Sequence, residues 1–164
     1  MSTTTSTQIS QISAPLRAFH GDANLKRRLL REIQKHAKAD AIVKGSYGDA
    51  LLSLAAGFKG CAVGCALHSL NMIEGETRPV GDHSRFPVEL GIPIELAYHI
   101  DTIFENLPDA ESQTWPHRVM AAIPPGADLA GVMPALLQWM ILDPKEGFIA
   151  QAKPEFHALS LIHI

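Results

Sequence analysis

The stretch NLKRRLLREIQKHAKADAIV, residues 24 to 43, decides the fold class of this chain. Its apolar residues recur every four positions: Leu25, Leu29, Ile33 and Ala37. Its basic residues fall on the opposite face: Arg27, Arg31, Lys35 and Lys38. This period of about 3.6 residues predicts an amphipathic helix with one buried face. Asp22 is a suitable N-cap, and Lys44-Gly45 is a typical stop signal.

Outward from this helix, apolar runs separated by Gly and Pro predict five further helices. They are expected at residues 50–58, 61–72, 93–107, 109–123 and 129–142, with a short additional piece around 145–153. Asp49 would open the first of them, and Pro93 suits the first turn of the third. No segment shows the β-branched alternation of a strand. The sequence therefore predicts an all-α fold, a compact bundle of about six helices without a sheet.

The bulk properties of the chain predict one soluble domain. Its 164 residues are 46% hydrophobic and 19% charged, with a net charge of -3, which does not require nucleic acid or an anionic membrane as partner. Two cysteines are too few for a disulfide scaffold, and the polar start resembles no signal peptide, so we expect a reducing cytoplasm. No apolar run is a convincing membrane span. We expect a disordered polar tail at residues 1–13 and a single helical domain at 14–153.

The end of the chain is expected to be artificial. LSLIHI, residues 159–164, is what one reading frame of a transposon adapter used for sequencing libraries would encode. We therefore expect residues 154–164 to belong to a truncated C-terminus, with 159–164 read through from adapter DNA. Such a segment is excluded from reasoning about the fold.

The only cysteines lie in GCAVGCALHS, residues 60–69, where Cys61, Cys65 and His68 share one face of the predicted helix. A first interpretation is structural, because small neighbours allow close helix packing and a free cysteine behaves as a small buried hydrophobe. A second is a metal site, for which thiolate and imidazole suit zinc. The helical rise separates Cys61 and His68 by about 10 Å, so a metal would need ligands from elsewhere. Asp82, His83 and His99 are candidates, and the hypothesis names Cys61, Cys65, His68 and His83.

A third interpretation of this stretch is thiol chemistry. The N-terminus of a helix favours the thiolate of Cys61, and a nearby histidine could relay protons. Alkylhydroperoxidase-D-type proteins have two cysteines followed by a histidine on an all-α scaffold, but they use C-x2-C spacing where this chain has C-x3-C.

The charge distribution suggests a surface for a partner. The basic face formed by Arg27, Arg31, Lys35 and Lys38 contrasts with residues 74–111, whose nine acidic residues include Asp101 and Glu105. The basic face could bind nucleic acid or an acidic protein, or the two regions could attract each other within one bundle or a homodimer.

A set of motifs carries a family resemblance. It comprises KGCAVGC (59–65) with His68 and His83, ELGIP (89–93), D-x-IFE-x-LP (101–108), WP-x-R (115–118) and AIP-x-GADL (122–129). Between about Ala39 and Asp143 the chain resembles uncharacterised bacterial and phage proteins of similar length. The resemblance implies matching positions for Cys61, Cys65, His68 and His83, and it brings no activity with it.

Together these observations favour a small cytoplasmic accessory or binding protein over an enzyme, because no catalytic mechanism is recognisable. Its Cys/His face would pack a helix interface or hold a metal ion. The alternatives are a thiol-dependent oxidoreductase and a nucleic-acid-binding accessory protein that uses the first helix.

Overall fold

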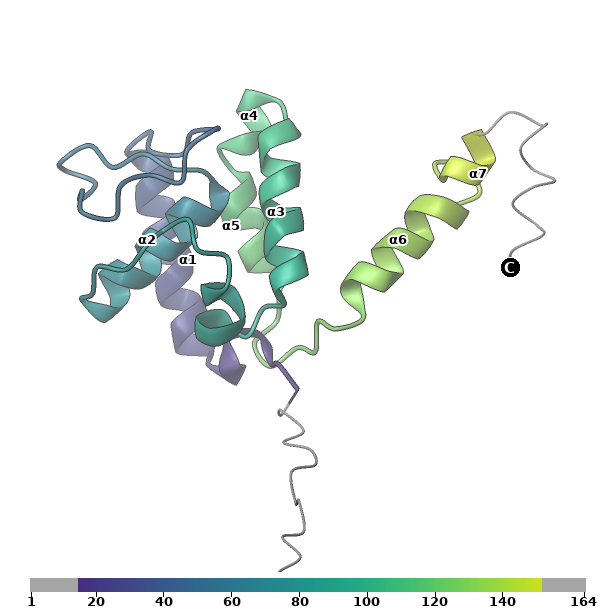
Figure 1. Cartoon of the computed structure of the whole chain (residues 1–164), viewed down its shortest axis with the longest axis horizontal. Helices are drawn as coiled ribbons and strands as arrows, with labels where there is room; N and C mark the ends of the chain where they lie inside the picture. The colour runs from purple at the N-terminus through teal and green to yellow at the C-terminus, as the bar shows by residue number, and fades with distance from the viewer. Residues whose placement is uncertain (1–14, 152–164) are drawn as a thin grey trace, which may run out of the picture.

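Helix α2 (Ala62–Glu74) lies among the packed helices of the computed structural model, which describes residues 15–151 (Figure 1). Every residue from Ala62 to Asn71 is buried. The small side chains along this helix allow neighbours to approach it from several sides. Helices α1 (Ala23–Lys38), α3 (Ile94–Asn106) and α5 (Trp115–Ala122) all pack against it.

The predicted all-α fold class is confirmed. Besides the four helices above, the described residues contain short elements and a C-terminal pair of helices: η1 (Ala18–Gly21), the π-helix η2 (Phe86–Leu90), α4 (Asp109–Ser112), α6 (Val132–Leu142) and α7 (Phe148–Gln151). Residues 15–151 contain no strand, and their one β-bridge joins Ile42 to Gly60. Within the same residues, no helix combines the length and the apolar character that crossing a membrane would require.

Helix α1 forms as predicted at its N-terminus and ends earlier than predicted. The carboxylate of Asp22 accepts a hydrogen bond from the Asn24 amide at 2.6 Å, which caps the helix. Leu29 and Ile33 are fully buried, one turn apart. The helix ends at Lys38 because Asp40 turns into the left-handed region, with φ of 52°. The chain after Ala41 is then free to pair with Gly60.

The prediction of a helix at residues 50–58 is wrong, because this segment forms a series of turns. The carboxylate of Asp49 accepts from the Leu51 amide in a local turn, and Gly48 has φ of +91°. Both ends of the loop are held by distant partners. The Val43 amide donates to the Gly60 carbonyl at 2.9 Å, and the Cys61 amide donates to Ser46 at 2.6 Å. An isolated helix of nine residues has little stability of its own, so these long-range hydrogen bonds decide the conformation of the segment.

The predicted helix at 109–123 is divided into α4 and α5. Pro116 cannot donate a backbone hydrogen bond, and it therefore occupies the first turn of a new helix, α5. The Thr114 hydroxyl donates to the Glu111 carbonyl at 3.1 Å across the break. These two corrections concern individual helices. The predicted compact helical bundle is confirmed, with α1, α2, α3 and α5 as its core beside shorter elements.

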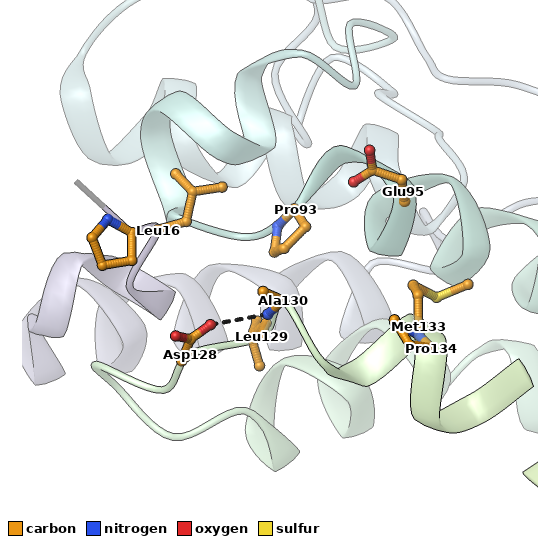
Figure 2. A pocket seen from close by; sticks show the side chains of 9 residues that line it. Leu16, Pro93, Glu95, Asp128, Leu129, Ala130, Met133 and Pro134 are labelled. Carbon is orange, nitrogen blue, oxygen red and sulfur yellow. Dashed lines mark hydrogen bonds between the residues drawn. The ribbon is translucent and has the colours of Figure 1, made fainter. Parts of the chain in front are cut away.

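Helix α6 extends away from this core, with α7 at its far end (Figure 1). None of its residues is buried, although most are apolar. At its N-terminal end lies an apolar groove of about 460 Å³, where Leu16, Pro93 and Met133 come together (Figure 2). The proposed tail at 1–13 and the proposed truncated segment at 154–164 lie outside the described residues.

Candidate metal centre

Cys61 occupies the N-cap position of α2. Its sulfur accepts a hydrogen bond from the Gly64 amide at 3.4 Å, and its side chain is buried. The preceding loop runs directly past this helix end. Gly60 and Gly64 both face the carbonyl of Tyr47, so closely that neither position has room for a Cβ atom. The small residues of this stretch therefore bring a backbone segment, residues 45–47, against the thiol.

Two carboxylates from α3 meet the sulfur of Cys61. Donor atoms of Cys61, Asp101 and Glu105 all lie within 4.8 Å of one another. Asp101 and Glu105 are four residues apart, so α3 presents them on one face, one turn from each other. Both carboxylate oxygens of Glu105 accept from the Gly45 amide, at 3.1 and 3.0 Å. Glu105 thereby fixes the loop that covers the cluster.

His83 lies beside this cluster, on the loop that follows α2, and contacts Asp101. Its Nε2 atom lies 3.4 Å from Asp101 Oδ2 and is buried without a hydrogen-bond partner among the described residues. Its Nδ1 atom donates to the Gly81 carbonyl at 3.3 Å, so Nε2 is the ring nitrogen that faces Asp101. The imidazole stacks on Tyr98 at 4.3 Å and meets the edge of Tyr47 at 5.5 Å. The orientation of the ring is thus fixed with Nε2 toward Asp101.

The electrostatics of this cluster favour a cation. Burial, followed by the Asp101 charge, raises the pKa of the Cys61 thiol, which the Gly64 amide only partly opposes. Burial and the Asp101 charge also raise the pKa of the Tyr47 phenol. Asp101 Oδ1 is itself buried without a hydrogen-bond partner within residues 15–151. A buried carboxylate oxygen without a partner is costly beside a thiol, and a bound cation would compensate for both.

Cys65 and His68, the other two predicted ligands, lie elsewhere in the core. The Cys65 thiol is fully buried and donates to the Gly60 carbonyl at 3.2 Å, and burial raises its pKa to about 12. His68 stacks on Phe58 with ring centroids 3.9 Å apart. The predicted set is therefore divided: Cys61 and His83 both face Asp101, whereas Cys65 and His68 pack around the 41–60 loop. Asp82 accepts from its neighbour Ser84.

His68 belongs to a buried histidine pair. Its Nδ1 atom lies 2.8 Å from His36 Nε2, and its Nε2 atom lies 2.9 Å from the Leu52 carbonyl. The other nitrogen of His36 bonds to the Glu32 carbonyl at 2.8 Å. Burial lowers the pKa of His36 to about 4, and it lowers the pKa of His68 as well.

This pair predicts loss of stability in acid. The unfolded chain takes up protons on these rings near pH 6.5, whereas folded His36 resists protonation until about pH 4. The free energy of unfolding should therefore be highest above pH 6.5 and fall by up to about 3 kcal/mol as the pH drops to 4. Urea titrations at several pH values would measure it, and His36→Phe should flatten the dependence. A free energy of unfolding that rises as the pH falls would contradict the prediction. It would mean that the folded pair holds a proton between His36 Nε2 and His68 Nδ1, in addition to the two that the rings donate to the carbonyls of Glu32 and Leu52.

The residues of the predicted basic partner surface are exposed and differ in their contacts. All four of its residues are exposed on α1: Arg27, Arg31, Lys35 and Lys38. Lys35 pairs with Glu32 at 2.7 Å on the same helix. Arg27 and Arg31 instead line a groove beside α5.

The sequence does not single out Asp101 and Glu105 as site residues. It shows them only as two of the nine acidic residues in 74–111. The available signal is their spacing of four on a helix whose other face is apolar. That spacing alone indicates a shared face, and it does not indicate which face meets Cys61. Comparison of the chain with family models, with curated proteins and with solved structures finds no match.

Proposed function

We propose that this protein binds a divalent transition metal ion, Zn²⁺ above all, through Cys61, His83, Asp101 and Glu105. The observation that carries the proposal is the buried Nε2 atom of His83. It has no hydrogen-bond partner within residues 15–151 and lies 3.4 Å from Asp101, whose carboxylate lies within 4.8 Å of the Cys61 sulfur. Asp101 Oδ1 likewise has no hydrogen-bond partner among the described residues, and a bound cation would satisfy both atoms.

The donor set favours zinc among the common metals. Thiolate and imidazole are the preferred zinc ligands, and carboxylates complete many four-coordinate sites. Ca²⁺ and Mg²⁺ prefer oxygen ligands only, so Cys61 and His83 argue against them. The hydrogen bond from His83 Nδ1 to the Gly81 carbonyl is the kind of outer contact that orients a metal-binding histidine.

The ion would have a structural effect on the fold. Its four ligands come from the start of α2, from the loop after α2, and from α3, while Glu105 holds the loop at Gly45. Metal binding would therefore tie together segments that are distant in the sequence. Binding also requires loss of the Cys61 proton, so affinity should increase with pH.

Two alternatives receive less support. A thiol oxidoreductase needs a reactive, accessible thiolate, but both thiols are buried and burial raises both of their pKa values. Nucleic-acid binding by α1 is not supported by this cluster, which lies away from the basic residues. A metal-binding role with a free thiol ligand fits a reducing cytoplasm, which remains part of the proposal.

The test is zinc stoichiometry and affinity in purified protein, by elemental analysis and competition with a chelating dye. We expect one zinc per chain. Asp101→Asn should weaken affinity at least about 100-fold, because even loss of an outer partner costs 10- to 100-fold. Glu95→Gln removes an exposed carboxylate from the same helix and is the matched control. A protein that binds no zinc, or an Asp101→Asn variant that binds it as tightly as wild type, would refute the proposal.

A further inference from the structure

A basic groove lies between α1 and α5, separate from the metal centre. It has a volume of about 640 Å³ and is lined chiefly by polar and basic side chains: Asn24, Arg27, Arg28, Arg31, Gln34 and His117. A second hollow of about 420 Å³ shares Gln34 and His117 with it and adds Arg118. The two hollows adjoin at Gln34 and His117 and are together called the groove here, and no Asp or Glu lines either part.

The helix pair itself is held by other contacts, which leaves these arginines available. The Lys26 ammonium donates to the carbonyls of Ala121 and Ile123, both at 2.7 Å, and the Gln34 amide bonds to His117 at 3.0 Å. These contacts run in opposite directions along the chain, so α1 and α5 are antiparallel.

The arginines of the groove lack acidic partners. Arg28 donates to the Ile73 carbonyl at 2.7 Å, and Arg27 donates to the Asn24 side chain. Within residues 15–151, Arg31 and Arg118 make no side-chain hydrogen bond, and none of the four forms an ion pair. Three exposed guanidinium groups, of Arg27, Arg28 and Arg31, line one hollow and repel each other, and an anion placed between them removes that repulsion.

We infer that this groove binds a small molecule that carries two or more phosphate groups. Arginine presents a planar fork of donors that matches phosphate oxygens, and it does so better than lysine. Arg27 and Arg31 are one turn apart, about 6 Å along the helix axis, which suits two adjacent phosphates better than one. The volume falls in the usual range for small-molecule sites.

A nucleic-acid strand fits the groove less well. Single-stranded binding relies on aromatic platforms for the bases and on a continuous basic track. No Phe, Tyr or Trp lines either part of the groove. Lys35, which would extend the track along α1, is neutralised by Glu32.

Calorimetric titration of the full chain with inorganic pyrophosphate at low ionic strength tests the inference. We expect saturable binding at one site. The double variant Arg27→Ala/Arg31→Ala should weaken it at least about tenfold, through loss of charge-assisted hydrogen bonds. Lys35→Ala/Lys38→Ala removes the same charge from the same helix outside the groove, and it should change affinity less than about twofold.

Equal losses of pyrophosphate affinity in the two double variants would overturn the inference. They would indicate that pyrophosphate is attracted by the overall positive charge of α1 and not by a defined site. No saturable binding at millimolar pyrophosphate would overturn it too. An oligothymidylate that binds more tightly than pyrophosphate, and that both variants weaken alike, would assign the face to nucleic acid instead. Zinc binding should be unchanged in both variants, which separates this groove from the proposed metal centre and shows that the fold is intact.

Discussion

Arg85→Met should lower the free energy of unfolding by about 3–5 kcal/mol. Arg85 is only 6% exposed, and it forms a two-pronged ion pair with Glu89, at 2.6 Å from Nε and 2.8 Å from one terminal nitrogen. Its remaining donors reach the Pro79 carbonyl at 2.7 Å and the Asn71 side chain at 2.9 Å. Loss of the guanidinium would leave Glu89 charged and buried.

The expected cost comes from the charge left behind more than from the bonds removed. Arg78 also donates to Glu89 at 2.7 Å, so a part of the compensation would survive. The double variant Arg85→Met/Glu89→Leu removes both charges and should recover much of the stability, because well-packed apolar residues often replace a buried pair without loss. Chemical denaturation of both variants measures this. A single variant that is as stable as wild type, or a double variant less stable than Arg85→Met, would contradict the prediction.

The same substitution should weaken the proposed metal centre. Arg85 holds the loop at Pro79, and His83 lies two residues before it on the same segment. A loosened loop would no longer fix the imidazole of His83 between Tyr47 and Tyr98. We therefore expect lower zinc affinity in Arg85→Met even under conditions where the variant is folded.

Gly64→Ala should destabilise the fold by about 2–3 kcal/mol, the usual cost of overpacking a core. A Cβ atom at this position would lie 2.0 Å from the Tyr47 carbonyl oxygen and 2.7 Å from its carbon. These are backbone atoms in a segment that Cys61 and Glu105 hold in place, so the loop must move as a unit. Movement of Tyr47 and Gly45 would also disturb the carboxylate of Glu105.

Gly131→Ala is the matched control for this substitution. Gly131 precedes α6 with φ of -82°, and a Cβ atom there would meet nothing within 4 Å. Its effect on thermal unfolding should remain within about 0.5 kcal/mol. Equal effects of the two substitutions would show that the close approach of Tyr47 to α2 is not a source of stability.

The fold could be predicted where helical periodicity agrees with tertiary burial. Leu29 and Ile33 are spaced for one face and are both buried, so α1 follows from the sequence. The 50–58 segment has an apolar composition that also suits a helix, but long-range hydrogen bonds at Gly60 and Cys61 impose a different conformation. Periodicity carries no information about such contacts.

The site was predictable in part for a similar reason. Helical spacing showed that Cys61, Cys65 and His68 could not easily share one ion, and that a residue such as His83 would have to come from a following loop. The contribution of α3 was not predictable, because it depends on which face of that helix packs against the start of α2. The four-residue spacing of Asp101 and Glu105 is equally typical of an exposed acidic helix face.

Titration of the protein with Co²⁺, followed by absorption spectroscopy, tests the proposed metal centre most directly. Cobalt occupies zinc sites and reports both its geometry and a coordinated thiolate. We predict that one equivalent produces the visible bands of a tetrahedral ion and a near-ultraviolet thiolate-to-metal band. Cys61→Ser should abolish the thiolate band, whereas Cys65→Ala should retain it. Absence of the thiolate band in the wild type, or its survival in Cys61→Ser, would contradict the proposed ligand set.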